Sequence, residues 1–377
     1  MRILSALWIA RVPSTAFIVL GFFWGAFAAS VPDIKAGLGV NDAVFGLLLL
    51  GNPIGLVSAM WLAPRIDAAL GPRALQAVTV GFACCFIIPG LAPTPLAFAL
   101  GIVALGTASG LTDVLMNARV SELEAHHKRT LMNVAHGMFS ASYAVSALAT
   151  GLLRDGGQPP VVALSIAAAA GLALCFFLRI SVEAPDDEPE GSVSGLPWGA
   201  VLLCGAIVFL AFMTEATVET WSALHVERTL GGDPLAGALG PVMLGLTMAI
   251  GRIGGQGLSD RFRDEHVIIV ATLLASLGAL IASVAATPMV AYIGFGTLGL
   301  GVSVIGPLGL ALIGRMVPAR LRTEAIAKVA VMGFSGFFIA PVLMGTISEL
   351  TSLRVAYAVV AVAVLMTIAL VLRLPRD

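Results

Sequence analysis

The feature that most constrains this chain is a succession of long apolar segments, each close to the length that crosses a bilayer. Charges, Pro clusters and Gly-rich turns divide the 377 residues into twelve such segments. A helix needs about 20 residues to cross the hydrocarbon core, and only helices or closed barrels satisfy their backbone hydrogen bonds in lipid. Strands of alternating polarity are absent from the pattern, which disfavours a barrel. We therefore predict an all-α membrane protein with twelve transmembrane helices.

The predicted spans form two groups of six. The first group covers 10–31, 43–63, 74–92, 96–118, 131–153 and 159–179, and the second covers 198–221, 236–256, 266–286, 290–314, 325–347 and 353–372. Between them, residues 183–195 replace apolar residues with Pro, Asp, Glu, Gly and Ser, as in a flexible acidic linker. We predict an N-terminal half over 1–180, a cytoplasmic linker over 181–196 and a C-terminal half over 197–377. The short connections leave no room for a soluble enzyme domain.

The basic residues are divided unequally between the two sides of the membrane. If both termini are cytoplasmic, the outer side keeps only four of the 21 Lys and Arg, and the inner group includes Arg252. The outer four are Lys35, Arg154, Arg228 and Arg354. This asymmetry predicts cytoplasmic termini and a protein of the plasma (inner) membrane. A net charge of -1 gives no electrostatic argument for nucleic acid, so we expect a monomer whose partners are lipid, a small solute and protons.

The two halves repeat each other at matching places. Pro64–Asp67 and Gly71–Arg73 follow the second span, and Gly257–Arg261 follows the eighth. The fourth span ends in Gly110–Arg119 and the tenth in Gly306–Arg315, which are frames of equal length. Paired six-span repeats with short basic turns are typical of secondary transporters, whose solute site lies near the midplane between the halves.

With these repeated segments, the chain resembles the major facilitator superfamily, and the resemblance covers essentially its whole length. The turn Gly257–Arg261 is similar to the superfamily's loop motif, in which an Asp and an Arg lock neighbouring helix ends on the cytoplasmic side. The resemblance implies the major facilitator fold, with two pseudo-symmetric halves. It also implies a cytoplasmic gate formed by Asp67, Arg73, Asp260 and Arg261.

Within the superfamily, two segments resemble the fucose-permease-like, proton-coupled branch. Asp113–Asn117 and Asn133–Phe139 are similar to its fourth and fifth spans, and this resemblance implies a proton-coupling role for Asp113. Glu215–Leu224 is similar to an acidic-then-Trp-Ser pattern in uncharacterised bacterial members. Asp33 follows Pro32 at the outer end of the first span, and whether it takes part in coupling stays open.

Few ionisable residues lie inside the spans, and each is costly there, by at least about 2.5–3.5 kcal/mol on insertion scales. Asp113 and His136 fall at one depth, with Asn117 and Asn133 about one turn away on the same faces. We predict that the four form one cluster in the inner half. It is either a proton relay or a hydrogen-bond network that holds the fourth and fifth spans together.

Glu215 and Glu219 share one face of the seventh span, where two carboxylates do not both ionise easily. They either gate the outer mouth, bind a hydroxylated or cationic solute, or carry a second proton. The alternative is a partly hydrated helix end paired with Arg228. We place Glu215 and Glu219 with Asp113 and His136 among the proton-coupling candidates.

Aromatic and amide side chains are the candidates for solute binding. They are Trp24, Asn117, Asn133, Phe139, Tyr143 and Trp221. Rings that carry a polar atom suit sugars as well as aromatic drugs, although most aromatic residues in a span pack against neighbours. Glu122 and His126 have a spacing that could bind a metal on a helix, but a solvated loop explains these residues. The sequence contains no phosphate loop. We therefore expect no metal and no cofactor.

These observations predict a secondary active transporter rather than an enzyme. It moves a small polar, sugar-like solute by alternating access between the halves, and proton-coupled symport is the favoured mode. A drug/proton antiporter of the multidrug efflux type is the alternative. A membrane-embedded enzyme and a channel are the two other classes considered, and the sequence names neither the solute nor the direction of transport.

Overall fold

The computed structural model describes residues 2–180, 195–259, 261–318 and 321–375, with side chains described except at 2–4, 255–259 and 323. Within these residues the elements are helices and no strand occurs. The N-terminal half contains α1 (Arg2–Ile9), α2 (Arg11–Leu38), α3 (Asp42–Leu48), α4 (Gly51–Leu70), η1 (Gly71–Arg73), α5 (Ala74–Cys85), α6 (Ile88–Leu91), α7 (Pro95–His127), α8 (Met132–Asp155), α9 (Pro160–Leu174) and η2 (Cys175–Phe177). The C-terminal half contains α10 (Trp198–Leu224), η3 (His225–Thr229), α11 (Pro234–Ser259), α12 (Asp264–Val284), α13 (Pro288–Met316), α14 (Arg322–Phe334), α15 (Gly336–Leu350) and α16 (Leu353–Val371).

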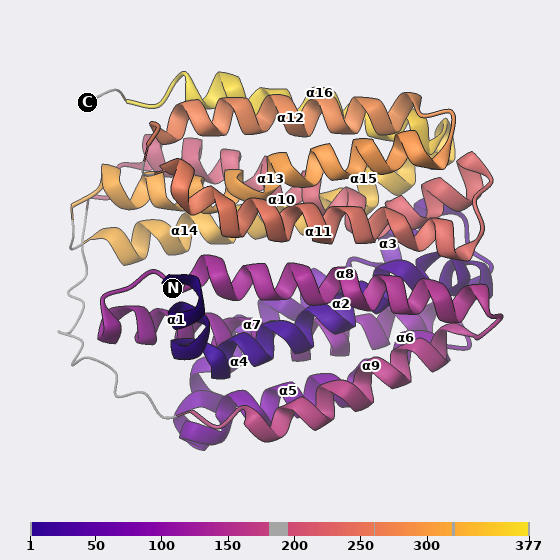
Figure 1. Ribbon diagram of the computed structural model, residues 1–377, viewed down its shortest axis with the longest axis horizontal. Coiled ribbons are helices and arrows are strands. Elements are labelled where there is room, and N and C mark those ends of the chain that lie inside the picture. The colour runs from indigo at the N-terminus through magenta and orange to yellow at the C-terminus, as the bar shows by residue number, and fades with distance from the viewer. Residues whose placement is uncertain (1, 181–194, 260, 319–320, 376–377) are drawn as a thin grey trace.

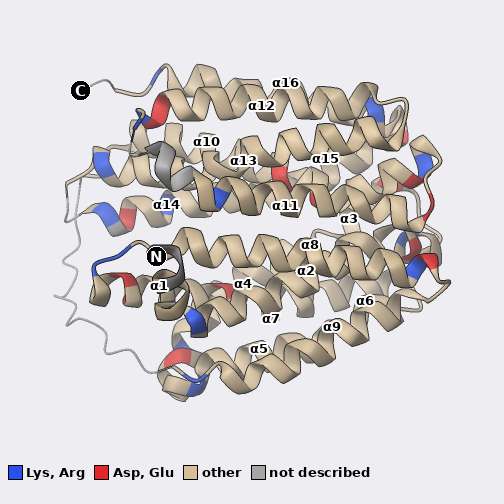
Figure 2. Ribbon diagram, viewed as in Figure 1, with Lys and Arg blue, Asp and Glu red and all other residues tan. Residues whose placement is uncertain are grey.

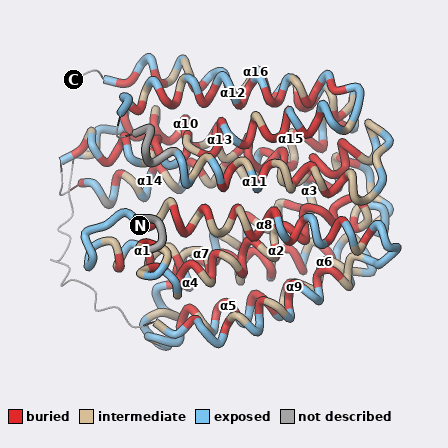
Figure 3. Tube along the Cα trace, viewed as in Figure 1, coloured by how far each residue is buried: buried red, intermediate tan, exposed pale blue. Residues whose placement is uncertain are grey.

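The described helices confirm the prediction of an all-helical membrane protein with twelve spans. Ten stretches are long and apolar enough to cross a membrane. One of them, Asp42–Leu91, turns back at Gly71, whose φ of 51° is left-handed, and so contains two spans. The more polar α8 completes the set. The side chains that face away from the bundle are largely exposed and apolar, as in a surface that contacts lipid (Figure 3).

Several helix boundaries differ from the predicted ones. The first span was expected to end before Pro32, but α2 continues to Leu38 and ends at Gly39, whose left-handed φ of 62° caps the helix. The fourth span was expected to end at 118, but α7 continues to His127. The second and eleventh spans are each broken into two helices, α3 with α4 and α14 with α15. Charged or Pro residues were treated as helix ends, and solvated helices extend past them.

The helices run side by side between two ends of the bundle (Figure 1). We call the end of the bundle where both described termini lie the linker end, and the opposite end the distal end (Figure 1). Charged residues concentrate at these two ends, and few lie midway (Figure 2). The predicted gate residue Asp260 and most of the predicted linker lie outside the described residues.

The two halves meet mainly along two pairs of helices, and α2 also contacts α10 and α11. Helix α8 packs along α11, and α3 packs against α15 at the distal end. Both contacts depend on glycine: a Cβ at Gly46 would lie 2.4 Å from the carbonyl oxygen of Pro341, and one at Gly245 would lie 2.7 Å from Cδ1 of Tyr143. Small residues that permit such close approach are a common means of packing helices in membranes.

Candidate solute and proton site

Asp113 lies midway along α7 and turns into the bundle. It is half-buried, and it lies on the face of α7 opposite to the exposed Ala104, because a helix turns about 100° per residue. Asn117, one turn further, donates from Nδ2 to Oδ1 of Asp113 at 3.1 Å and to its carbonyl oxygen at 2.8 Å. A carboxylate inside the bundle is therefore held by an amide and stays within reach of solvent.

His136 on α8 extends this arrangement to the neighbouring helix. Its Nε2 lies 3.3 Å from Oδ1 of Asn117, and because a carbonyl oxygen only accepts, the imidazole is the donor. The ring of Phe17 on α2 packs edge-on against His136, with centroids 4.8 Å apart. Asn117 thus joins Asp113 to His136. Asn133 is half-buried one turn away and, among the described residues, forms no hydrogen bond to these three.

Arg252 is a largely buried cation inside the bundle, and the sequence analysis had counted it among the basic residues of the inner side. Its guanidinium donates from Nη2 to Oε1 of Glu215 at 3.1 Å and from Nη1 to Oγ of Ser140 at 2.7 Å. The side chains of Arg252 and Glu215 are only 10% and 8% exposed. The long side chain turns into the bundle because Glu215 compensates its charge there. Glu215 therefore pairs with Arg252, and not with Arg228 as one alternative held.

One face of α8 brings the two polar groups together. His136, Ser140 and Tyr143 follow each other at helical spacing, and Ser140 donates to the carbonyl oxygen of His136 at 3.1 Å. The guanidinium of Arg252 is close enough to His136 for electrostatic interaction. Asp113, Asn117, His136, Ser140, Tyr143, Glu215, Glu219 and Arg252 form what we call the central site. It draws on both halves.

Glu219 and Tyr143 are the members of the central site that have unused polar atoms. Glu219 is half-buried one turn beyond Glu215 on α10, and no ion pair or hydrogen bond engages its carboxylate within the described chain. The Tyr143 hydroxyl is buried without a hydrogen-bond partner among the described residues, and it lies within electrostatic range of both Glu219 and Glu215. The ring of Phe139 is 6.1 Å from that of Tyr143. These groups can receive a ligand.

The two predicted tryptophans lie in different surroundings. Trp24 on α2 is half-buried and packs edge-on against Phe27 at 5.7 Å. Trp221 on α10 is fully buried, and its ring meets Phe45 of the other half at 6.1 Å. Its Nε1 has no partner among the described residues. Trp221 therefore belongs to the contact between the halves on the distal side of the central site.

At the distal end, Arg154 ties the two halves together. Its guanidinium, 1% exposed, donates to both carboxylate oxygens of Asp33 at 2.7 Å, to those of Glu227 at 2.7 and 3.2 Å, and to the Ala29 carbonyl at 2.7 Å. Asp33 and Ala29 lie in the same half as Arg154, whereas Glu227 lies in the other. The bonds to Glu227 can survive only while the distal end is closed.

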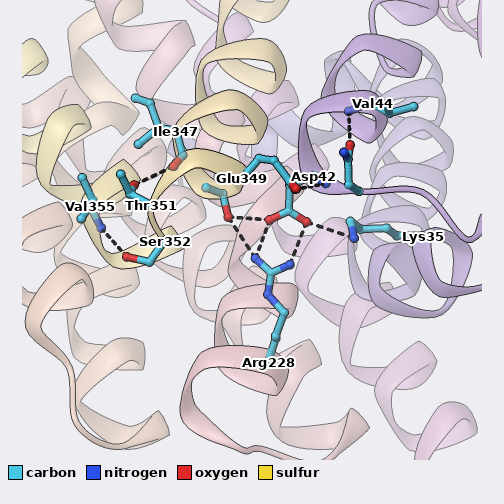
Figure 4. Close-up of polar contacts among 11 residues, drawn as sticks. Lys35, Asp42, Val44, Arg228, Ile347, Glu349, Thr351, Ser352 and Val355 are labelled. Atoms are coloured by element: carbon cyan, nitrogen blue, oxygen red, sulfur yellow. Dashed lines mark hydrogen bonds and ion pairs between the residues drawn. The ribbon is translucent and has the colours of Figure 1, made fainter.

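A second ionic cluster surrounds Asp42 at the start of α3 (Figure 4). Its carboxylate accepts from Arg228 at 2.7 and 2.5 Å, from the hydroxyl of Ser348 at 2.5 Å and from Lys35 at 3.0 Å. The Asp42 backbone N–H donates to Glu349 at 3.0 Å. Because Arg228, Ser348 and Glu349 belong to the C-terminal half, this cluster also closes the distal end.

The sequence analysis did not identify these clusters, although a signal was present. Lys35, Arg154 and Arg228 are three of the four cations assigned to the outer side, and each pairs with a carboxylate. Glu227 and Arg228 lie on η3, a π-helical turn of a kind often found at functional sites. Cations on the side that normally lacks them were the clue.

At the linker end, the described polar contacts stay within each half. Asp67 pairs with Arg119 on α7, and Arg119 also donates to Glu122 at 2.6 Å. In the C-terminal half, Arg315 pairs with Asp264. The predicted gate residues Arg73 and Arg261 are exposed, and neither forms an ion pair with a described residue. The ionic closure between the halves is therefore at the distal end only, as far as the described residues extend.

Two halves of helices that enclose a polar site and are tied together at one end define a membrane transport protein. The model of the Major Facilitator Superfamily matches residues 14–297 and 204–377, and this chain belongs to that superfamily.

Three comparisons illustrate the relationship. An uncharacterized MFS-type transporter from Yersinia pestis is 31% identical over 355 residues, which are 93% of this chain and 91% of the relative. The inward open structure of the xylose transporter XylE from E. coli matches with a TM-score of 0.77 at 13% identity, covering 99% of this chain and 97% of that one. A D-xylose-proton symporter matches with a TM-score of 0.75 at 14% identity, covering 98% of each chain. The two structures share the fold.

Proposed function

We propose that this transporter is a proton-coupled symporter of a small polar, sugar-like solute and works by alternating access. The observation that carries the proposal is the central site itself: buried and half-buried ionisable groups on α7, α8 and α10 lie inside the bundle, while ion pairs between the halves close the distal end. Such a site is reached from one end at a time if the halves rock. The matches to a xylose transporter and to a D-xylose-proton symporter support this solute class and the coupling ion.

The linker end is the cytoplasmic end in this proposal, and the membrane is the plasma (inner) membrane. With Arg252 now inside the bundle, the remaining basic residues still favour the linker side, as the positive-inside rule requires. The structure then represents an inward-facing state of a monomer whose halves are residues 1–180 and 197–377. The gate at the cytoplasmic end would form when the halves rock the other way, with Asp67, Arg73, Asp260 and Arg261 at its helix ends.

Asp113 is the proposed proton carrier. A carboxylate that is hydrogen-bonded by Asn117 and connected through it to His136 can exchange a proton while solvent reaches it. The positive charge of Arg252 acts on two further carboxylates: it pairs with Glu215, and Glu219 lies within its electrostatic range. The solute would bind among Asn117, Asn133, Phe139 and Tyr143, with Trp24 and Trp221 as walls. Asp113 and its neighbours resemble the fucose-permease-like branch, which supports this assignment.

Drug/proton antiport is the second candidate, because a carboxylate without a cationic partner can bind either a proton or a cationic drug. Asp113 and Glu219 are two such carboxylates within the described chain. The hydrogen-bonding side chains of the central site favour a hydroxylated solute over a large apolar cation, so symport is the mode we propose.

Two measurements test the function. Thermal unfolding of the purified protein with sugars, sugar acids, nucleosides and hydrophobic cations identifies the solute class, because a ligand that binds the native state raises its stability. Uptake into proteoliposomes with an imposed proton gradient then shows coupling. We expect Asp113→Asn to abolish uphill accumulation and keep solute counterflow, whereas Asp155→Asn, at an exposed distal carboxylate, changes neither. Undiminished uphill uptake by Asp113→Asn would exclude the proposed coupling.

A further inference from the structure

The charges of the central site do not balance. Three carboxylates, those of Asp113, Glu215 and Glu219, lie there with one guanidinium, that of Arg252. Arg252 already donates to Glu215 and to Ser140. His136 donates to Asn117 and adds no fixed positive charge as a neutral imidazole. Whenever Glu219 is ionised, the site therefore holds more carboxylates than cations.

Glu219 is the carboxylate best placed to receive a ligand. It is half-buried, and no described hydrogen-bond or ion-pair partner engages it. The buried hydroxyl of Tyr143, 2% exposed, has no partner among the described residues and lies within electrostatic range of Glu219. A buried polar atom without a partner is destabilising, so it marks a position where a ligand's polar group belongs. The acidic group and the orphan hydroxyl point to one subsite.

We infer that the transported solute carries a protonated amine beside its hydroxyl groups, and that Glu219 is the counter-ion of this amine, with the Tyr143 hydroxyl bonded to a neighbouring polar atom of the solute. This inference rests on the proposed function and names its solute class. A carboxylate on the solute is disfavoured, because Glu215 already neutralises Arg252 and further negative charge would lie among unpaired carboxylates.

The position of Glu219 separates amine binding from proton coupling. Glu219 lies on α10 in the C-terminal half, whereas Asp113 is joined to Asn117 and His136 in the N-terminal half. One carboxylate can hold the solute's amine while the other exchanges the proton. The solute and the proton then bind to different carboxylates and can be carried together, as symport requires. If both competed for one carboxylate, only antiport would be possible.

Two sets of matched compounds test the inference. Glucose, glucosamine and glucuronate present no charge, a cation or an anion on the same sugar ring, and benzyl alcohol, benzylamine and benzoate do so on an aromatic ring. Dissociation constants for the full-length protein are measured by thermal shift at neutral pH. One of the two sets should bind, and within that set we expect the amine to bind at least about tenfold more tightly than the anion, as a charge-assisted hydrogen bond implies.

The variant Glu219→Gln provides the decisive comparison. We expect it to remove the preference for the amine and to leave binding of the neutral compound unchanged, which also shows that the variant is folded. Asp155→Asn, at an exposed distal carboxylate outside the two ionic clusters, should keep the preference. Tighter binding of the anion, or a preference for the amine that survives in Glu219→Gln, overturns the inference and leaves the transporter proposal standing. If no compound of either set binds, the proposed solute class itself is wrong.

Discussion

Replacing Glu227 by Gln should open the distal end without unfolding the protein. Glu227 accepts two hydrogen bonds from Arg154, at 2.7 and 3.2 Å, and both cross between the halves. The amide keeps one acceptor oxygen but loses the charge. Arg154 retains both bonds to Asp33, so no buried cation is left without a counter-ion.

The size of the effect follows from these contacts. A hydrogen bond to a charged group contributes about 1.5–3 kcal/mol and a neutral one about 0.5–1.5 kcal/mol. The Arg154 cation keeps one bond, to the amide oxygen, in place of two, so the closed distal end loses about one charge-assisted bond and is weakened by about 2 kcal/mol. Because the Glu227 bonds exist in one state only, this difference shifts the equilibrium toward the distal-open state about 30-fold.

Spin labels across the distal end measure this shift. Gly37 and Leu350 are exposed positions in opposite halves and accept labels in a protein whose four native cysteines, Cys84, Cys85, Cys175 and Cys204, have been replaced. Pulsed electron spin resonance then reports the distribution of distances between the two labels. We expect Glu227→Gln to add a longer distance that the parent protein lacks.

Asp33→Asn is the matched control. It removes charge-assisted bonds of similar length from the same guanidinium, but Asp33 lies in the same half as Arg154. It should lower the melting temperature without adding the longer distance. If both variants give the same distance distribution, or if Glu227→Gln leaves it unchanged, the ion pair between the halves does not hold the distal end closed.

Three further predictions concern packing and charge elsewhere. Gly245→Ala should reduce the stability of the protein by about 1–3 kcal/mol and so lower its melting temperature, because an added Cβ would lie within 3.1 Å of three atoms of α8. Gly254→Ala on the same helix, where no atom lies within 4 Å, should not lower it. Asp67→Asn should reduce thermal stability because Asp67 pairs with Arg119, whereas Arg73→Gln should have little effect because Arg73 is exposed. Asn117→Ala should slow uphill accumulation and spare counterflow, since Asn117 alone connects Asp113 to His136 among the described contacts, and equal loss of both activities would contradict this role.

The number and order of the spans could be predicted because each span must be long and apolar to cross a bilayer, which is a local property of the chain. The proximity of Asp113, Asn117 and His136 could also be anticipated, since residues at one depth on consecutive helices meet. Helix ends were less predictable, because α7 and α2 continue past the apolar residues that define the spans, and α2 continues into the ionic contacts of the distal end.

The contacts between the halves could not be predicted from local patterns. Arg252 was counted among the basic residues of the inner side, and only the position of Glu215 and Ser140 explains why it turns into the bundle. Asp42 likewise resembles a residue at an ordinary helix start. Its partners Arg228 and Ser348 are far away in sequence, so the distal cluster emerges only when both halves are assembled.

The most direct test of alternating access asks from which side a reagent reaches the central site. Phe139→Cys places a thiol at a half-buried position on α8, and a membrane-impermeant maleimide is applied to either face of oriented vesicles. We predict labelling from the linker side in the parent protein, and labelling from the distal side once Glu227→Gln and Asp42→Asn are added. Labelling of the parent protein from both sides would indicate a channel, and labelling from neither side would indicate a sealed seam between helices; either result contradicts the account.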